Sequence, residues 1–259
     1  MQIRLMTSNI CGEYFGNPAG PRAPLLTKVF ERYASDILGL QEVCPHWWDS
    51  SLIPALSGKY AMSVAQTDDN VNYTPLFYRE ERLELLSASR YLFHMELDPS
   101  KGWNYGVFRE RLNRKVFAVF NTHFWWKPEL RDDVIRRYNA MEMTAEMESI
   151  GRQFSCPVFF MGDLNCTCDS MAWNYLESHG WKTSFQCTED YSSYSSHHGN
   201  PVIHPDGTCT GCITEEPKER SIDHIGIPAG IKVLRQCAVI DREALDSSDH
   251  SPVYADVEF

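Results

Sequence analysis

The stretch PVFFMGDLN at residues 157–165 joins an apolar run to a carboxylate and an amide. Its first part, Pro157–Met161, has the short apolar and aromatic composition that predicts a buried β-strand. Its second part ends that strand with Asp163 and Asn165. Because an unpartnered buried polar group costs about 1–3 kcal/mol, these two side chains need partners from other parts of the chain.

Five further strand-like segments carry polar residues in the same way. They are Ser8-Asn9 after the first strand-like run, Gln41-Glu42 after Asp36–Leu40, Asn121-Thr122-His123 after Val116–Phe120, Asp223-His224 within Ile222–Ile227, and Ser248-Asp249-His250-Ser251 before the last strand. Six such places in one sequence indicate that the side chains converge and satisfy one another around a metal ion and its waters.

The whole sequence predicts many strands and few helices. Strands are expected at Gln2–Ile10, Asp36–Leu40, Lys59–Val64, Pro75–Tyr78, Leu83–Ala88, Val107–Leu112, Val116–Thr122, Val158–Leu164, Ile222–Ile227, Ile231–Ile240 and Val253–Phe259. Helices are expected along the faces Leu25, Leu26, Val29, Phe30, Tyr33 and Leu130, Val134, Tyr138, Met141, Ala145, after Pro45, and over Ser170–Ser178 with Asp169 or Ser170 as the cap. We expect one α/β (α+β) domain over residues 1–259, with two packed sheets and helices outside. Residues 186–220 are expected to form long loops.

Composition limits the possible functions. The chain has 259 residues, 43% apolar and 23% charged, which is ordinary for a globular protein with a substantial core. The net charge of -11 argues against a broad electrostatic contact with duplex DNA, although a bound cation can reverse the field locally. No apolar run is long enough to cross a bilayer, and no signal-peptide pattern opens the sequence. We therefore expect a cytoplasmic monomer without a membrane span.

The cysteines and loop histidines have simple interpretations. Nine cysteines follow no regular spacing, which favours reduced thiols. Two close pairs, Cys166 with Cys168 and Cys209 with Cys212, leave a zinc site open as an alternative. The histidines of the polar stretch, His197, His198 and His204, are expected at the surface.

The residue types at the strand ends suit a hard cation. Asn9, Glu42 and Asp249 offer only oxygen ligands, which favours Mg²⁺ or Mn²⁺ over a structural zinc ion. Such an ion neutralises a phosphoryl oxygen and stabilises the charge that develops during hydrolysis. The sequence therefore predicts chemistry on a phosphate ester.

The remaining strand-end residues supply the groups that this chemistry needs. His123 and His250 can donate hydrogen bonds to phosphoryl oxygens. Asp163 can take a proton from the attacking water, with Asn165 orienting that water or the phosphate. Asp223 paired with His250 would hold the imidazole in one tautomer and favour its charged form.

The ordered motifs resemble a known family. SNI, LQEV, NTHF, GDLN, IDHI and SDHSP, running from residue 8 to residue 251, resemble the endonuclease/exonuclease/phosphatase (DNase I-like) superfamily, in particular its small bacterial members. The resemblance implies a four-layer αββα sandwich of two mixed sheets, with the active site at one end. It also implies metal ligation by Asn9, Glu42 and Asp249, and catalytic roles for Asp163, Asn165, Asp223, His250 and His123. Asp223-His224 stands where many members have Asp-Tyr, which leaves the aspartate in place and changes its neighbour.

Two further residues are candidates for substrate binding. Arg109 follows the stretch Lys101-Gly102-Trp103 and can contact phosphate, with a structural ion pair as the alternative. Trp125 lies directly after the NTHF motif, so one indole of the pair Trp125-Trp126 can stack on a base, sugar or lipid group while the other packs in the core.

Taken one at a time, these residues have structural interpretations: a strand-end amide, a helix N-terminal acid, a turn, a satisfied histidine. The complete ordered set favours a divalent-metal-dependent phosphoesterase that hydrolyses a phosphodiester or phosphomonoester by direct attack of water, on a small or single-stranded substrate. One alternative is a nuclease, either AP endonuclease-like or a deadenylase-like exonuclease, with a local Lys/Arg patch at its site. A second is a catalytically silent binding module with the same fold, against which the intact set of metal and proton-transfer groups counts.

Overall fold

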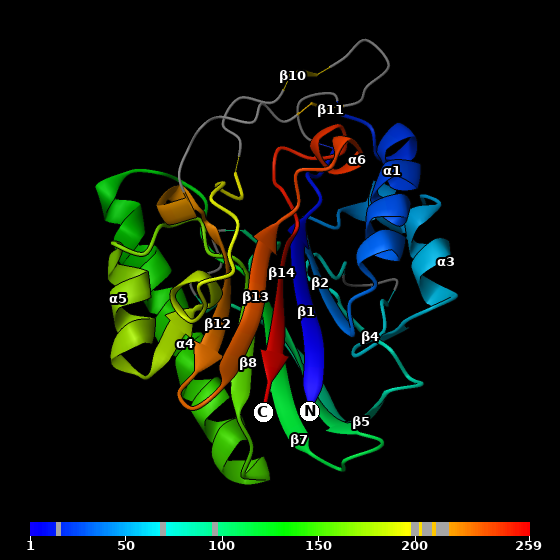
Figure 1. The fold of residues 1–259 in the computed structure, drawn as a ribbon. Helices are drawn as coiled ribbons and strands as arrows, with labels where there is room; N and C mark the ends of the chain where they lie inside the picture. Colours follow the sequence, from blue (N-terminus) through cyan, green and yellow to red (C-terminus); the bar gives the residue numbers. More distant parts are fainter. Residues whose placement is uncertain (14–16, 68–70, 95–97, 198–201, 204–208, 211–217) are drawn as a thin grey trace.

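Two six-stranded β-sheets pack face to face and carry helices on their outer surfaces (Figure 1). The structure is a computed structural model. It describes residues 1–13, 17–67, 71–94, 98–197, 202–203, 209–210 and 218–259. Both sheets are mixed, since β1 runs parallel to β2, and β7 runs parallel to β8, among otherwise antiparallel neighbours. The predicted four-layer α/β sandwich is confirmed.

The first sheet has the strand order β13-β14-β1-β2-β4-β3 and the second has the order β5-β6-β7-β8-β12-β9. In the first sheet the strands are β13 Lys232–Ala238, β14 Val253–Glu258, β1 Gln2–Asn9, β2 Ile37–Gln41, β4 Leu76–Tyr78 and β3 Ala61–Met62. In the second they are β5 Leu83–Leu92, β6 Gly102–Glu110, β7 Val116–His123, β8 Val158–Asp163, β12 Asp223–Pro228 and β9 Trp181–Thr183. A separate ribbon pairs β10 Val202–Ile203 with β11 Cys209–Thr210.

The helices divide between the two outer faces. Against the first sheet lie α1 Ala19–Tyr33, α2 Pro45–Trp48, α3 Leu52–Ser57 and α6 Arg242–Leu245, and against the second lie α4 Leu130–Phe154 and α5 Met171–Ser178. Two short 3₁₀ helices, η1 Ser184–Gln186 and η2 Lys218–Arg220, complete the described elements. None of the described helices combines the length and apolar character that a bilayer crossing needs.

The alternation of side chains along the central strands builds three apolar layers. In β8, Phe159 and Met161 point between the sheets, while Phe160 packs against the helices of the second sheet. In β1, Leu5 lies between the sheets and Met6 faces the helices of the first sheet. In β8 the residues from Val158 to Met161 form a continuous apolar run because both faces of the strand are buried.

Most predicted elements are present, but one predicted helix face is wrong. In α4, Leu130 is 84% exposed, and Val134 and Tyr138 are also exposed. The face that packs on the second sheet is instead formed by Ala140, Met143, Met147 and Ile150. The first half of α4 turns polar groups inward, where Asp132, Arg136 and Asn139 bind residues 125–127. The predicted cap of α5 is confirmed as Ser170, whose Oγ accepts the N–H of Trp173 at 3.0 Å.

Strand boundaries differ from the predicted ones most clearly in three places. The predicted strand Leu83–Ala88 continues to Leu92 as β5. The predicted strand Val107–Leu112 overlaps β6, which begins five residues earlier at Gly102 and ends at Glu110. The predicted strand Lys59–Val64 shortens to β3. The described part of the polar stretch 186–220 is mostly irregular, as expected.

The two ends of the chain lie side by side at the edge of the sandwich far from the site described below (Figure 1). Strand β14 inserts between β13 and β1, and it pairs with β1 from Gln2–Glu258 to Thr7–Val253. The amino group of Met1 donates to the carbonyl of Phe259 at 2.7 Å.

Candidate active site

Three neighbouring strands of the second sheet, β7, β8 and β12, bring polar side chains into one row, and β6 places Gly102 at the end of it. Gly102 of β6 pairs with His123 of β7, which also pairs with Asp163 of β8. Asp163 pairs in turn with Asp223 of β12. Paired residues of adjacent strands lie about 5 Å apart, so the register joins the motifs NTHF, GDLN and IDHI although they are distant in sequence.

The glycine before Asp163 is required by the backbone. Gly162 has a φ of +148°, and a Cβ at this position would lie 2.0 Å from the carbonyl oxygen of Thr122. Only glycine fits a backbone that approaches its neighbour this closely. Gly162 therefore holds the end of β8, and with it Asp163, tightly against the end of β7.

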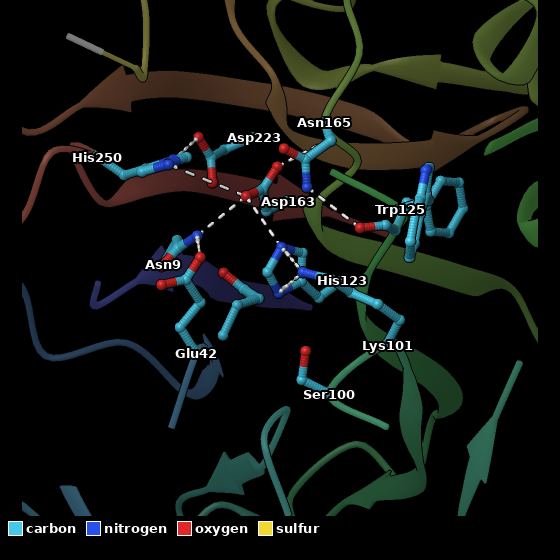
Figure 2. Close-up of polar contacts among 12 residues, drawn as sticks. Asn9, Glu42, Ser100, Lys101, His123, Trp125, Asp163, Asn165, Asp223 and His250 are labelled. Atoms are coloured by element: carbon cyan, nitrogen blue, oxygen red, sulfur yellow. Dashed lines mark hydrogen bonds and ion pairs between the residues drawn. The ribbon is translucent and has the colours of Figure 1, made fainter. Parts of the chain in front are cut away.

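The first sheet contributes residues from the ends of β1 and β2. Asn9 is the last residue of β1, and its Nδ2 donates to Glu42 Oε1 at 3.1 Å and to Asp163 Oδ2 at 3.0 Å (Figure 2). Asn9 Oδ1 accepts the N–H of Cys11 at 3.0 Å, and Glu42 Oε2 accepts the N–H of Gly12 at 2.8 Å. One amide thus links the two sheets at the site.

Glu42 has a strained backbone. Its φ is +62°, in the left-handed region that a non-glycine residue rarely adopts. Such strain costs on the order of 1–3 kcal/mol and is characteristic of functional sites. Its carboxylate is directed toward the ends of β1 and β8 by this turn (Figure 2).

Asp163 lies at the centre of the group. Its Oδ1 accepts the N–H of Asn165 at 2.8 Å, and its Oδ2 lies 3.4 Å from His123 Nε2 and 4.0 Å from His250 Nε2. Burial and the charge of Asp223 raise the pKa of Asp163 to about 7, against the opposing effects of His250, Asn9 and Lys101. Its carboxyl therefore changes protonation state near neutral pH.

Asp223 and His250 form a buried charged pair. His250 Nδ1 lies 2.8 Å from Asp223 Oδ2. Burial alone would lower the pKa of His250, but the charges of Asp223 and Asp249 outweigh burial and hold this pKa well above its ordinary value. Burial would raise the pKa of Asp223, but the charge of His250 and their hydrogen bond keep it below its ordinary value. Ser196 fixes the carboxylate, since its Oγ donates to Asp223 Oδ2 at 2.7 Å and accepts the Asp223 N–H at 3.1 Å.

His123 is a neutral histidine that contacts a lysine. Lys101 immediately precedes β6, and its Nζ lies 2.7 Å from His123 Nε2 and 3.1 Å from His123 Nδ1. Burial, followed by the charges of Lys101 and His250, lowers the pKa of His123 well below its ordinary value. Burial also lowers the pKa of Lys101, while Glu42 and Asp163 act in the opposite direction.

Asn165 completes the GDLN turn. Its φ of +50° is a left-handed conformation that asparagine tolerates better than most residues. Its Nδ2 donates to the carbonyl of Phe124 at 3.1 Å, next to the NTHF motif (Figure 2). The amide is thereby held beside Asp163.

The donor set fits a hard divalent cation. The expected ligands offer carboxylate and amide oxygens, the donors that Mg²⁺ and Mn²⁺ prefer. Ligand atoms of Asp163, Asp223 and His250 lie within 4.8 Å of one another, as do those of His197, Asp249 and His250. Asp223 Oδ1 is buried and has no hydrogen-bond partner among the described residues. Glu42 belongs to neither of these groups. It is connected to Asp163 through Asn9, whose Nδ2 donates to both carboxylates.

A comparison with known protein families identifies the family of this chain. A model of the Endonuclease/Exonuclease/phosphatase family matches residues 6–250. The chain belongs to this family. The human protein angel homolog 1 is 31% identical over 192 residues, which cover 64% of this chain and 28% of the human protein. The chain thus spans less than a third of that relative's length.

Solved structures of the endonuclease/exonuclease/phosphatase fold superpose over the whole chain. The mannosyl-6-phosphatase of Bacteroides thetaiotaomicron gives a TM-score of 0.80 at 20% identity and covers 99% of this chain and 100% of that one. The human nocturnin catalytic domain gives 0.72 at 19% identity, covering 100% and 94%. At these identities the likeness shows a shared fold.

The two predicted substrate-binding residues, Arg109 and Trp125, do not expose their side chains at the site as the motif residues do. Arg109 is near the other end of β6, seven residues from Gly102, and its guanidinium lies 3.2 Å from the Glu84 carboxylate. The structure does not bring Arg109 to the site, because seven residues of strand span about 23 Å. Trp125 is 8% exposed and donates its indole N–H to Asp132 at 2.7 Å, whereas its neighbour Trp126 is 53% exposed.

Three site residues were not predicted from the sequence. Lys101 lies before a strand whose beginning was placed too late, and Ser196 lies in an irregular segment without a motif. His197 was expected at the surface, but it is half-buried with its ring centroid 4.7 Å from that of His250. His198 and His204 lie outside the described residues.

The structure gives no support for a zinc site at the described cysteines of the two close pairs. Burial raises the pKa values of Cys166 and Cys168 to about 12, which keeps both thiols protonated. Within the described residues, neither belongs to a group with metal-ligand spacing. Cys212 and the side chain of Cys209 lie outside the description.

Proposed function

We propose that the chain is a divalent-metal-dependent phosphoesterase, which hydrolyses a phosphodiester or phosphomonoester by direct attack of water on phosphorus. The observation that supports this most is the position of Asp163. It is a buried carboxyl with a pKa of about 7, hydrogen-bonded to the end of the opposite sheet and adjacent to a charged aspartate–histidine pair. A carboxyl in these surroundings suits proton transfer at neutral pH.

In the proposed reaction, Asp163 accepts a proton from the attacking water. A base is most effective when its pKa lies near the working pH, and the pKa of Asp163 meets this condition. Asn165 lies two residues further along the same turn and orients the water or the phosphate. The hydrogen bond from the Asn165 backbone N–H to Asp163 Oδ1 fixes their spacing.

The imidazolium of His250 stabilises negative charge on the phosphoryl group. Asp223 holds the Nδ1 side of the ring, so the Nε2–H is directed toward Asp163 and remains available to a phosphoryl oxygen. His123, on the other side of Asp163, contacts the phosphate or the leaving group as a neutral ring.

The metal ligands in this proposal are Asn9, Glu42 and Asp249. A Mg²⁺ or Mn²⁺ ion held there would neutralise a phosphoryl oxygen and the charge that develops on it. The side chains of Asn9 and Glu42 are joined by the hydrogen bond from Asn9 Nδ2 to Glu42 Oε1, and Asn9 Oδ1 accepts the N–H of Cys11. Asp249 is adjacent to His250 and belongs to a group with metal-ligand spacing.

The substrate in this proposal is small or single-stranded. The net charge of -11 disfavours the broad phosphate contacts that duplex DNA requires. A nuclease, AP endonuclease-like or deadenylase-like, is the second candidate, favoured by the superposition on D. rerio TDP2 complexed with a single-strand DNA product, at a TM-score of 0.70 and 15% identity. The retained proton-transfer groups argue against a silent binding module.

Hydrolysis of bis-p-nitrophenyl phosphate and p-nitrophenyl phosphate, with short single-stranded RNA and DNA alongside, tests the proposal. Activity should require Mn²⁺ or Mg²⁺ and should be abolished by EDTA. Asp163→Ala and His250→Ala should each lower kcat about 10²-fold or more, with the fold retained.

Matched controls distinguish loss of chemistry from general damage. Asp49→Ala and His94→Ala remove exposed residues of the same types and should leave the rate unchanged. Full activity in EDTA would refute the metal role. Full activity of Asp163→Ala would refute the assignment of the base.

A further inference from the structure

Lys101 carries a buried ammonium group that has no carboxylate at ion-pair distance among the described residues. The residue is 7% exposed, and its Nζ contacts only the two ring nitrogens of His123 in the described part of the chain. A buried charge without an opposite charge in contact is unfavourable. Lys101 is therefore a cation whose partner is not supplied by the described residues around it.

The position of this ammonium is inside the catalytic group. Figure 2 shows Lys101 and His123 on one side of Asp163 and the Asp223–His250 pair on the other. The carboxylates that act on Lys101 do so beyond contact distance, and they are those of Glu42, Asp163 and Asp98. The two cationic side chains of the site thus flank the proposed base from opposite sides.

The backbone around Lys101 fixes where its side chain begins. The N–H of Lys101 donates to the carbonyl of Asp98 at 3.1 Å, and the hydroxyl of Ser100 donates to the Asp98 carboxylate at 2.7 Å. Gly102 allows β6 to approach β5, because a Cβ there would lie 2.2 Å from the carbonyl oxygen of Tyr91. A tight turn and a glycine therefore hold the lysine at the beginning of β6, opposite the end of β7.

We propose that Lys101 is a phosphate-binding residue of this site, whose ammonium contacts a non-bridging oxygen of the bound phosphoryl group. The inference deepens the proposed function and rests on it. A lysine ammonium has three N–H donors, and the imidazole ring of His123 alone does not accept hydrogen bonds from all three. A phosphate oxygen would supply both the missing acceptor and the missing negative charge.

A different role is a purely structural one, in which Lys101 only keeps His123 neutral and in place. The two roles differ in what removing the charge does to anion binding. A structural lysine acts through His123, so its removal should not change the affinity for a free anion in a chain that already carries His123→Ala. A phosphate-binding lysine changes that affinity whether or not His123 is present.

Calorimetric titration with inorganic phosphate, the anion common to all phosphate esters, tests the proposal on the full chain in EDTA. Lys101→Met should weaken phosphate binding about tenfold or more, both in the unmodified chain and in a chain that carries His123→Ala, because it removes a charged hydrogen bond. A loss that is seen only while His123 is present would overturn the inference. Lys101→Arg should keep most of the affinity. The control Lys232→Met removes a lysine at the opposite end of the first sheet, paired there with Glu258, and should bind phosphate like the unmodified chain.

Several outcomes would overturn the inference: no phosphate binding by the unmodified chain, equal binding by Lys101→Met, or equal loss in Lys101→Met and Lys101→Arg. Thermal unfolding checks that each variant folds, and Lys101→Gln replaces Lys101→Met if the latter does not. Hydrolysis is measured in parallel. A chain that binds phosphate through Lys101 but hydrolyses no ester would refute the proposed function and leave this inference standing.

Discussion

At the scale of single residues, Asp163 combines two opposing requirements. Burial and the neighbouring charge of Asp223 favour its protonated form, whereas a base must be ionised. Folding raises its pKa from an ordinary value of 3.8 to about 7. Ionisation of this carboxyl therefore destabilises the folded chain, and stability is lost as the pH rises toward and through 7.

Asp163→Asn should separate these two effects. The amide cannot accept the proton, so kcat should fall about 10²-fold or more. The same change removes a destabilising buried charge, so the unfolding temperature at pH 8 should equal or exceed that of the unmodified chain. At pH 5 this advantage should be clearly smaller, because folded Asp163 is then protonated and only ionisation of the same carboxyl in the unfolded chain still disfavours folding. Scanning calorimetry at the two pH values, beside the rate, checks both parts, and a variant markedly less stable at pH 8 would contradict the account.

The pH profile of the unmodified chain follows from the same group. Below about pH 7, kcat/KM should fall as Asp163 takes up a proton. His250 limits the profile only at higher pH, because its pKa is raised and its charged form persists. A bound cation would move the acid limb to lower pH without reversing it. An initial rate that increases toward acid pH would therefore exclude Asp163 as the base.

Residue-level prediction succeeded where a strand supplied the frame. Asp163 and His123 follow apolar runs, so their place at strand ends could be read directly. Lys101 could not be found in this way, because β6 begins with polar and aromatic residues rather than a clear apolar run. Within it, Asn104 is fully buried and donates to Asn72 Oδ1 at 2.9 Å and to the carbonyl of Thr74 at 2.7 Å. Such satisfied polar groups inside a strand hide its beginning from pattern analysis.

At the scale of elements, the junction of β7 and β8 controls the site more than either strand alone. Gly162→Ala should separate the two strands locally, because the added Cβ would overlap the backbone of Thr122. We expect a loss of about 1–3 kcal/mol in the free energy of unfolding and a fall in kcat, because Asp163 moves with the strand.

Gly58→Ala is the matched control for this variant. Gly58 ends α3 with a φ of -73° and a ψ of -13°, and a Cβ added there would make an ordinary contact, 3.6 Å from the carbonyl oxygen of Ala55. Since alanine adopts this backbone conformation without strain and loses less conformational freedom on folding than glycine, this variant should be neutral or slightly stabilising. Urea unfolding of both variants gives the comparison. Equal stability of the two would show that the close approach at Gly162 is unimportant.

The helix α4 shows why an element's existence is easier to predict than its orientation. Its length and composition predicted a helix correctly. Its packing face was wrong because two sets of apolar residues compete, and polar contacts decide between them. Asp132 and Asn139 bind the indole and backbone of Trp125, which turns Leu130 outward. Contacts of this kind depend on the path of the backbone at residues 125–127, which the hydrophobic pattern of the sequence does not predict.

At the scale of the whole molecule, charge limits the choice of substrate. The excess of 35 acidic over 24 basic residues opposes the approach of a long polyanion. Supercoiled plasmid should therefore remain intact under conditions in which small or single-stranded esters are hydrolysed, at both low and high salt. Gel analysis of the plasmid beside the chromogenic assay checks this, and efficient nicking at low salt would contradict it.

The position of β14 has a consequence for how the molecule forms. This strand follows all the other described strands in the sequence, yet it occupies the interior of the first sheet, between β13 and β1. Its pairing with β1 joins residues far apart along the chain, and such distant contacts slow folding. Asp249 and His250 immediately precede it. A growing polypeptide on the ribosome therefore carries an incomplete candidate site, and the last of these strands to be synthesised brings Asp249 and His250 into place.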